Sequence, residues 1–280
     1  NNIINHNVID SVGNYAIRMD GKSSLCEANV ASNALLTHND GALIYCWGLD
    51  SSFTHNNIIR NNIVRNSHGN LSGSPKSKLI NVGIYIDNNA NHISVENNTV
   101  EGTQIGILFN SMSFNNKAIK NTVFDNMSAI SFSEYHQNLP IYGTDIYENI
   151  LIGVDYEQKT LNLKSYVHPV IDPGIIENNF HYNPKDPFFV KYLSTYENFR
   201  RQDEMNLKAW REKGYDINGA TVDPSLIKSG YKIPEIFTNT GDDSLAITLD
   251  GEWINLEGKR IRKLVVEPFS SQVLLKKQEE

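Results

Sequence analysis

The sequence lacks features that would place it in several large functional classes. It contains no run of 18 apolar residues, so no segment of it is expected to cross a membrane. Its 25 Lys and Arg residues are outnumbered by 32 Asp and Glu residues. The resulting net charge of −7 argues against a nucleic-acid partner, because phosphate-binding surfaces need clustered basic side chains. Neither a Walker glycine loop nor a dinucleotide-binding glycine pattern occurs.

Cysteine is also scarce, with only Cys26 and Cys46 in the chain. Two cysteines form neither a disulfide framework nor a zinc site, and we expect both to be free, buried or half-buried thiols. The histidines show no ligand spacing, and we expect no metal or cofactor. The run DNNAN, which begins at Asp87, carries oxygen ligands that suit calcium, but it lacks the spacing of a calcium loop.

Asparagine, in contrast, is abundant and patterned, with 27 copies in the first 150 residues. Six of them stand between aliphatic or small residues at intervals of 23 to 36 positions: Asn7, Asn33, Asn62, Asn98, Asn121 and Asn149. A second motif follows each of the first five, in the forms YAIRMD, GALIYC, VGIYID, IGILFN and SAISFS. We align these on a small residue, which is Ala16, Ala42, Gly83, Gly106 or Ala129.

A period of this length, built from short β-branched runs, is typical of a solenoid. Each unit would supply short strands that stack on parallel neighbours about 4.8 Å away. An Asn at a fixed turn could bond the same amide one coil above and one below, which would satisfy polar groups that a tight inward turn buries. We therefore predict an all-β protein with a right-handed parallel β-helix. A leucine-rich repeat is the alternative, but it requires leucines before the Asn that this chain does not have.

The alternation of N-x-[VIL] with G-I-Y-[IL]-D over residues 1–152 resembles the parallel β-helix carbohydrate-active enzymes of the pectate-lyase-like superfamily. The resemblance implies a carbohydrate substrate and a secreted, periplasmic or cell-surface bacterial protein. The first residues, NNIINHNVID, already follow the repeat. We therefore expect the chain to be the C-terminal portion of a longer protein, whose targeting signal and first coils precede it.

Three parts are expected along the chain. Residues 1–155 form the β-helix coils, and residues 156–230 form a looped segment with a helix near 203–213 that caps the solenoid. Residues 231–280 form a small antiparallel β module, with turns at Asp250-Gly251 and Glu257-Gly258. Similar tails end many secreted bacterial β-helix enzymes, so the resemblance implies a stabilising or accessory role for this module. A sugar-binding module around Trp253 is the alternative.

Strand alternation in the second motif predicts which side chains leave the core. Asp20 and Asp87 fall on one outward column two coils apart, with Cys46 between them, so their backbones should lie about 9 to 10 Å apart. Inverting glycosidases hold two carboxyl groups roughly 6.5 to 9.5 Å apart. The predicted outward positions are Arg18, Ile44, Tyr85, Leu108 and Ser131 in one column, and Asp20, Cys46, Asp87, Asn110 and Ser133 in the other.

We accordingly predict Asp87 and Asp20 as the catalytic pair, with the acid and base roles unassigned. Substrate-binding roles are predicted for nearby polar and aromatic side chains: Arg18, Tyr85, Asn110, Trp47 and His38, the last beside Asp40 in LTHNDG. The competing interpretation is structural, because an Asp followed by DNNAN-type residues also makes a turn.

The leading functional hypothesis is a glycoside hydrolase that acts on a poly- or oligosaccharide by an inverting-type mechanism. A polysaccharide lyase of the same fold is the second hypothesis, although the predicted outward columns offer only Arg18 as a basic group. A non-catalytic β-helix protein that binds glycans or acts as an adhesin is the third. Nothing in the pattern indicates an oligomeric state.

Overall fold

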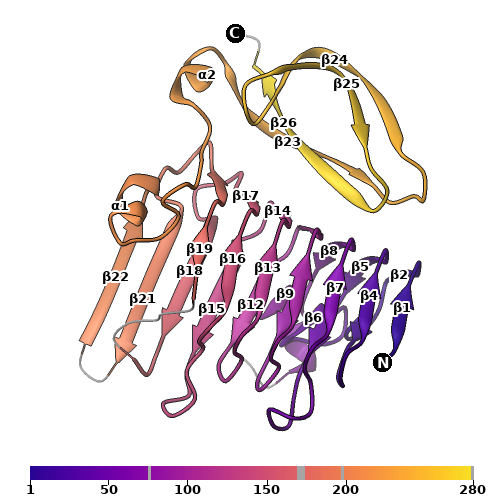
Figure 1. The fold of residues 1–280 in the computed structure, drawn as a ribbon, viewed down its shortest axis with the longest axis vertical. Helices are drawn as coiled ribbons and strands as arrows, with labels where there is room; N and C mark the ends of the chain where they lie inside the picture. The colour runs from indigo at the N-terminus through magenta and orange to yellow at the C-terminus, as the bar shows by residue number, and fades with distance from the viewer. Residues whose placement is uncertain (75–76, 169–173, 197–198, 279–280) are drawn as a thin grey trace.

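Short strands that recur along the chain stack into three long sheets in the computed structural model, which describes residues 1–74, 77–168, 174–196 and 199–278. Most coils contribute one strand to each sheet, and corresponding strands of successive coils pair in parallel (Figure 1). The protein is therefore an all-β parallel β-helix, as the sequence predicts. Three strands a coil exclude the leucine-rich repeat, in which each repeat adds one strand and a helical segment.

The strands divide among the sheets by their order within each coil. Sheet A contains β1 (Ile3–Asn5), β4 (Leu25–Glu27), β7 (Ile58–Arg60), β10 (Ser94–Glu96), β13 (Lys117–Ile119), β16 (Asp145–Tyr147) and β19 (Ile176–Glu177). Sheet B contains β2 (Val8–Asp10), β5 (Val30–Ala34), β8 (Ile63–Ser67), β11 (Thr99–Glu101), β14 (Thr122–Phe124), β17 (Ile150–Ile152) and β20 (Phe180–Tyr182). Sheet C contains β3 (Ile17–Arg18), β6 (Gly41–Cys46), β9 (Asn81–Ile86), β12 (Ile105–Asn110), β15 (Ser128–Glu134), β18 (Lys159–Ser165), β21 (Val190–Tyr196) and the antiparallel β22 (Phe199–Met205).

A ladder of amide side chains runs along the turn between sheets A and B. In its middle, Oδ1 of Asn121 accepts hydrogen bonds of 3.0 Å from both the backbone N and Nδ2 of Asn98. The residue before each ladder Asn has a positive φ, which turns the chain inward and buries the amide that follows. The ladder consists of Asn7, Asn29, Asn62, Asn98, Asn121, Asn149 and Asn179.

The predicted ladder position in the second coil, Asn33, is wrong. Asn29 occupies it, and Asn33 instead donates to Asp10 at the surface. The prediction fails because it favours large aliphatic neighbours. The coil places the smaller Cys26 and Ala31 in the core columns that flank Asn29, where they pair with Ile4 and Ile9 of the first coil.

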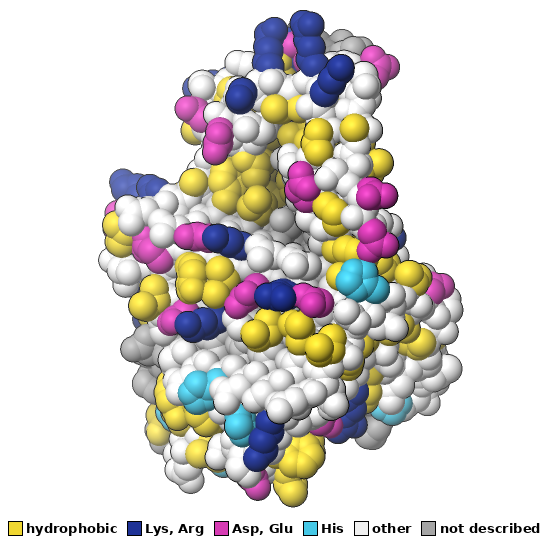
Figure 2. All heavy atoms as spheres, turned by 45° about the vertical axis from the view of Figure 1, so that its right-hand side comes forward, with side chains coloured by type: hydrophobic (Ala, Val, Ile, Leu, Met, Phe, Trp, Pro, Cys, Tyr) yellow, Lys and Arg dark blue, Asp and Glu magenta, His cyan; other side chains and the backbone are white. Residues whose placement is uncertain are grey.

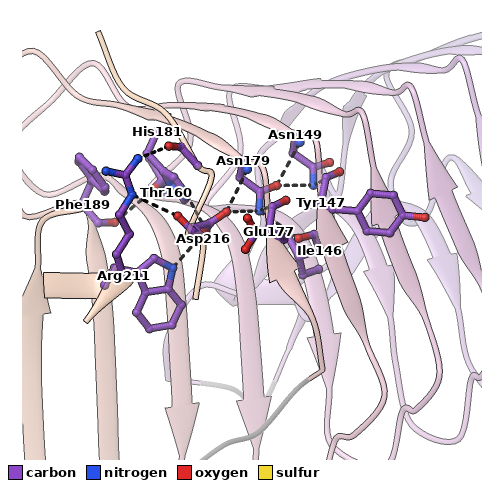
Figure 3. Close-up of polar contacts among 12 residues, drawn as sticks. Ile146, Tyr147, Asn149, Thr160, Glu177, Asn179, His181, Phe189, Arg211 and Asp216 are labelled. Atoms are coloured by element: carbon purple, nitrogen blue, oxygen red, sulfur yellow. Dashed lines mark hydrogen bonds and ion pairs between the residues drawn. The ribbon is translucent and has the colours of Figure 1, made fainter. Parts of the chain in front are cut away.

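The ladder ends on a carboxylate rather than on another amide. Asp216 Oδ1 accepts 2.9 Å hydrogen bonds from the backbone N and Nδ2 of Asn179. Asp216 Oδ2 accepts from His181 at 3.0 Å and from the indole of Trp210 at 3.1 Å. Figure 3 shows Asp216 facing Asn179 and His181, with Arg211 beside it. Because Asp216 and His181 are completely buried, this cluster closes the core at the C-terminal end of the solenoid.

Parallel coils continue beyond residue 155, where the sequence analysis expects loops. Strands β18 to β21 add to all three sheets, and β22 then pairs antiparallel with β21. The predicted capping helix is present as α1 (Leu207–Arg211), which buries Leu207 and Trp210 against the core. It is shorter than predicted because residues 199–205 pair as β22, and Asn206 caps it by accepting a hydrogen bond from the Ala209 amide.

After α2 (Pro224–Lys228), a four-stranded antiparallel module follows, as predicted. It contains β23 (Tyr231–Asn239), β24 (Leu245–Asn255), β25 (Arg260–Val266) and β26 (Ser270–Lys277). The module packs on the outer face of sheet B, where Phe269 contacts Val30 and Ile63. Figure 2 shows it standing above the coils, with Lys and Arg side chains gathered at its far end.

Two predictions inside the module need correction. Asp250-Gly251 does not join two strands, because β24 runs through it and the pairing with β25 shifts register there. The second predicted turn, Glu257-Gly258, is confirmed and connects β24 to β25. Trp253 is buried beside Phe237 and donates to the Asp250 carbonyl, so its ring offers no exposed face to a sugar. No helix in the described part of the chain is long and apolar enough to span a membrane. Cys26 and Cys46 are both free and buried, as predicted.

Candidate functional site

A groove of about 1070 Å³ runs along the outer face of sheet C. Side chains from β6, β9, β12, β15, β18 and β21 form its floor, and the loops before and after these strands form its walls. Strand alternation places polar side chains here because each core-facing Ile, Leu or Phe is followed by a residue that points outward. The groove therefore presents a row of outward side chains across successive coils, as an extended ligand would require.

Asp87 lies at one end of the groove, directly after β9, and is only 8% exposed. Tyr45 donates a 2.6 Å hydrogen bond to its Oδ2, and Asn110 Nδ2 donates a 2.7 Å hydrogen bond to its Oδ1. Both carboxylate oxygens thus accept, which is the arrangement that an ionised carboxyl group makes. Asp87 is held in one orientation on the groove floor.

Tyrosines surround this carboxylate. The ring of Tyr45 meets that of Tyr85 edge to face at 5.3 Å, and Asn110 Nδ2 also donates to the Tyr85 hydroxyl at 2.9 Å. Burial, and then the charge of Asp87, raise the pKa values of Tyr45 and Tyr85 well above the usual tyrosine value. Both phenols therefore stay protonated and remain available as hydrogen-bond donors.

Tyr45 is a residue of this site that the sequence analysis missed. Ile44 of β6 pairs with Ile84 of β9, so Tyr45 lies beside Tyr85 on the outer face. The predicted register is off by one residue in this coil, and Ile44 and Cys46 therefore point into the core instead of outward. A one-residue slip moves every side chain of a strand to the other face. The pairing places Leu43, rather than Ala42, at the position of Gly83, and aligning the motif on Leu43 puts Tyr45 in the column of Tyr85.

Asp20, the predicted partner of Asp87, does not line the groove. Arg18 Nε donates to its Oδ2 at 2.5 Å, and the backbone N of Trp47 donates to its Oδ1 at 3.0 Å. The guanidinium of Arg18 also lies 5.6 Å from the ring centre of Tyr45. Asp20 thus ties Arg18 and the end of β6 together at the margin of the tyrosine cluster.

A different carboxylate, Asp40, shares the groove with Asp87. It precedes β6, and its charge, like that of Asp87, contributes to the raised pKa of Tyr85. Asp40 lies at the edge of sheet C where the strands begin, whereas Asp87 lies at the edge where they end. His38, Arg18 and Trp47 lie outside the groove lining, whereas the predicted residues Tyr85 and Asn110 lie within it.

The opposite end of the groove is rich in lysine. Lys164 projects from β18, Lys191 from β21, and Lys78 from the loop before β9. We call the region of Lys164 and Lys191 the lysine end; the charge of Lys78, from the loop before β9, also acts on Lys164. The sequence analysis missed it because it expects loops here. The alternating segment KTLNLKS, which is β18, carries the signal, since its two leucines face the core and Asn162 and Lys164 face outward.

The described residues contain no group of three or more His, Cys, Asp or Glu side chains placed to hold a metal ion. Comparison with models of known protein families, with curated protein sequences and with solved protein structures finds no match. The functional argument therefore rests on the groove itself.

Proposed function

We propose that the protein cleaves glycosidic bonds of a poly- or oligosaccharide bound along the sheet C groove. The observation that carries the proposal is the hydrogen-bonded Asp87 carboxylate on the floor of a groove of about 1070 Å³. Glycoside hydrolysis uses two carboxyl groups on either side of the scissile bond. An open, polar groove with tyrosines suits a sugar chain, which offers hydroxyls to hydrogen-bond and ring faces to contact.

Asp40 is the proposed partner of Asp87, in place of Asp20. Asp20 lies outside the groove lining, whereas Asp40 lines the groove and its charge acts on Tyr85, which adjoins Asp87. Asp87, with both oxygens accepting, suits the general base that activates a water molecule. Asp40 would then protonate the leaving oxygen. Asp20 would act by positioning Arg18 and the strand end.

The experiment is a screen of the 280-residue chain on a panel of neutral and acidic glycans, with released reducing ends as the readout. On a substrate that is cleaved, Asp87→Asn and Asp40→Asn should each lower kcat/KM by about 100-fold or more, in the range of general acid–base catalysis. Asp250→Asn, at an exposed bulge of the module, is the matched control and should leave activity unchanged. Full activity in both groove variants would overturn the assignment.

A polysaccharide lyase is the second candidate, and the lysine end favours it. β-Elimination from a uronate needs a base and a cation near the carboxylate, and Lys164 is a partly buried amine in the groove. Burial, and then the charges of Lys191 and Lys78, lower the pKa of Lys164, which moves this amine toward a proton acceptor at neutral pH. Ultraviolet absorbance of an unsaturated uronate product would identify the lyase, and its absence on cleaved substrate would identify the hydrolase. Binding without any cleavage would favour the non-catalytic glycan-binding hypothesis.

A further inference from the structure

We infer that the lysine end of the groove is a binding subsite for an anionic substituent, a carboxylate or a sulfate, on the glycan chain. The inference rests on the proposed function only in taking the groove as a glycan site. It concerns binding at the opposite end of the groove from Asp87, and it can be tested without any turnover.

Lys164 and Lys191 stand on paired strands at the lysine end, and the charge of Lys78 also acts on Lys164. Lys164 and Lys78 make no side-chain hydrogen bond or ion pair with any described residue, and Lys191 has one contact of 3.5 Å with Glu204. Like charges that approach one another in a partly desolvated groove repel, and an anion between them would relieve the repulsion. The burial and mutual charge effects on Lys164 reflect this geometry.

The neighbouring Lys159, in contrast, is paired with two carboxylates. Its ammonium donates to Asp186 at 2.5 Å, to Glu204 at 3.0 Å and to the Phe188 carbonyl at 2.8 Å. The nearby carboxylates are therefore directed mainly to Lys159, which joins β18 to β22. Lys164, five residues further along β18, lines the groove without such partners.

The floor between the two ends carries polar atoms that also lack partners. Ser131 Oγ and Asn162 Oδ1 make no hydrogen bond in the described structure, although these residues are only 1% and 6% exposed. Their strands pair directly, Ser131 opposite Asn162, and both side chains line the groove. These two oxygens on the groove floor can accept hydrogen bonds from the hydroxyl groups of a bound sugar.

The two ends lie several sugar units apart. Asn110 follows Asp87 in the outward column, Ser133 pairs with Asn110, and Lys164 pairs with Ser133. Three steps between neighbouring strands correspond to about 14 Å. The anionic substituent would therefore belong to a sugar that is not at the scissile bond, and the ligand must be an oligosaccharide.

Binding is measured in the Asp87→Asn variant by calorimetric titration with three hexasaccharides, one bearing carboxylates (oligogalacturonate), one bearing sulfates (an oligocarrageenan) and one neutral (cellohexaose). We expect at least one anionic hexamer to bind about tenfold or more tightly than the neutral one, the effect of a charge-assisted hydrogen bond. The better of the two anionic hexamers identifies the substituent. Lys164→Gln should abolish this preference without weakening the neutral ligand, whereas Lys213→Gln, an exposed lysine after α1, should not change it.

Lys78→Gln is a second test in case Lys164→Gln misfolds. Lys78 is exposed in a loop, so its substitution should weaken the preference for anionic hexamers without lowering the melting temperature. Equal binding of all three hexamers, failure of both anionic hexamers to bind, or a preference that survives Lys164→Gln and Lys78→Gln would overturn the inference. A lysine-dependent preference in a protein that cleaves nothing would uphold it while overturning the proposed catalysis. Cleavage of neutral glycans without any anion preference would uphold the proposed catalysis and overturn the inferred anion subsite.

Discussion

The Tyr45 hydroxyl lies 2.6 Å from Oδ2 of Asp87, so a phenol on one coil fixes a buried carboxylate on the next. The bond depends on the pairing of β6 with β9, which aligns Tyr45 with Tyr85. Its strength depends on burial, because a hydrogen bond to a charged group in a desolvated site exceeds an ordinary one. The orientation of the candidate catalytic carboxylate is thus a property of the solenoid stack.

Removing that hydroxyl should destabilise the protein and disturb the groove. Tyr45→Phe leaves Oδ2 of Asp87 without its phenol donor, and we expect a loss of about 1–3 kcal/mol in the free energy of unfolding. Denaturation in urea measures it. Tyr142→Phe is the control, because the Tyr142 ring stacks on Phe114 while its hydroxyl makes no hydrogen bond with a described residue. Equal, small losses in both variants would contradict the role given to Tyr45.

The middle of the asparagine ladder should tolerate substitution far less than its end. Asn121→Ala removes two bonds that its amide donates, to Asn149 and to the Val95 carbonyl, and the two that it accepts from Asn98. We expect a loss of about 3 kcal/mol or more. Asn7→Ala, at the exposed first coil, should lose about 1 kcal/mol or less. Similar losses at the two positions would show that the ladder does not act as a buried unit.

The Asp216–His181 pair predicts how stability depends on pH. Burial acts to raise the pKa of Asp216, but the hydrogen bond and charge of His181 and the bonds from Asn179 outweigh it and hold this pKa below its usual value. Since the folded pKa is depressed, the stabilisation is complete above the unfolded value of about 3.9 and is lost as the pH falls through the folded value. Thermal melts at descending pH should show a steep fall below about pH 4.

Asp216→Asn tests the origin of that fall. An Asn could still accept from Asn179, but its amide would face the donors of His181 and Trp210. We expect a loss of about 3–5 kcal/mol at neutral pH, since the substitution breaks a buried pair, and a shallower dependence on pH below about 4. A wild-type-like acid profile in this variant would assign the pH dependence to other carboxylates.

Gly106 should not accept a side chain. A Cβ built there would lie 2.4 Å from Cγ1 of Val123 and 2.5 Å from the Ala129 carbonyl oxygen, where β12 and β15 pass close to sheet B. We expect Gly106→Ala to lower stability by about 1–3 kcal/mol through overpacking. Gly241→Ala, whose nearest atom would be 3.5 Å away, is the matched control and should be neutral. An unchanged melting temperature for Gly106→Ala would show that the coils can separate there.

The repeat was readable from sequence wherever a coil kept large aliphatic residues beside its Asn, as around Asn62 and Asn98. It failed at Asn29, because Cys26 and Ala31 fill the same core columns with small side chains. The coil of Asn179 was missed because His181 stands where the preceding coil has Leu151, and beyond it Asp216 replaces the amide and β22 turns back antiparallel. These departures from the repeat depend on local packing, and the repeat period alone does not predict them.

The site was predictable in part for the same reason. Alternation identified Asp87, Tyr85 and Asn110 because GIYID and GILFN share one register. Tyr45 was missed because the predicted register of β6 differs by one residue from the observed one, and the segment GALIYC alone does not distinguish the two registers. The presence of Asp40 in the groove lining depends on how the loop before β6 folds against the sheet, which strand spacing does not predict.

The number of stacked coils sets the distances between residues along the groove. Asp87 and Lys164 stand on the same column three strand steps apart, so whole coils, and not side-chain lengths, set their separation. Duplicating or deleting one coil between β9 and β18 would move the two ends by about 4.8 Å while leaving each intact. Evolution or protein design could thereby change the distance between Asp87 and Lys164 without altering the residues at either end.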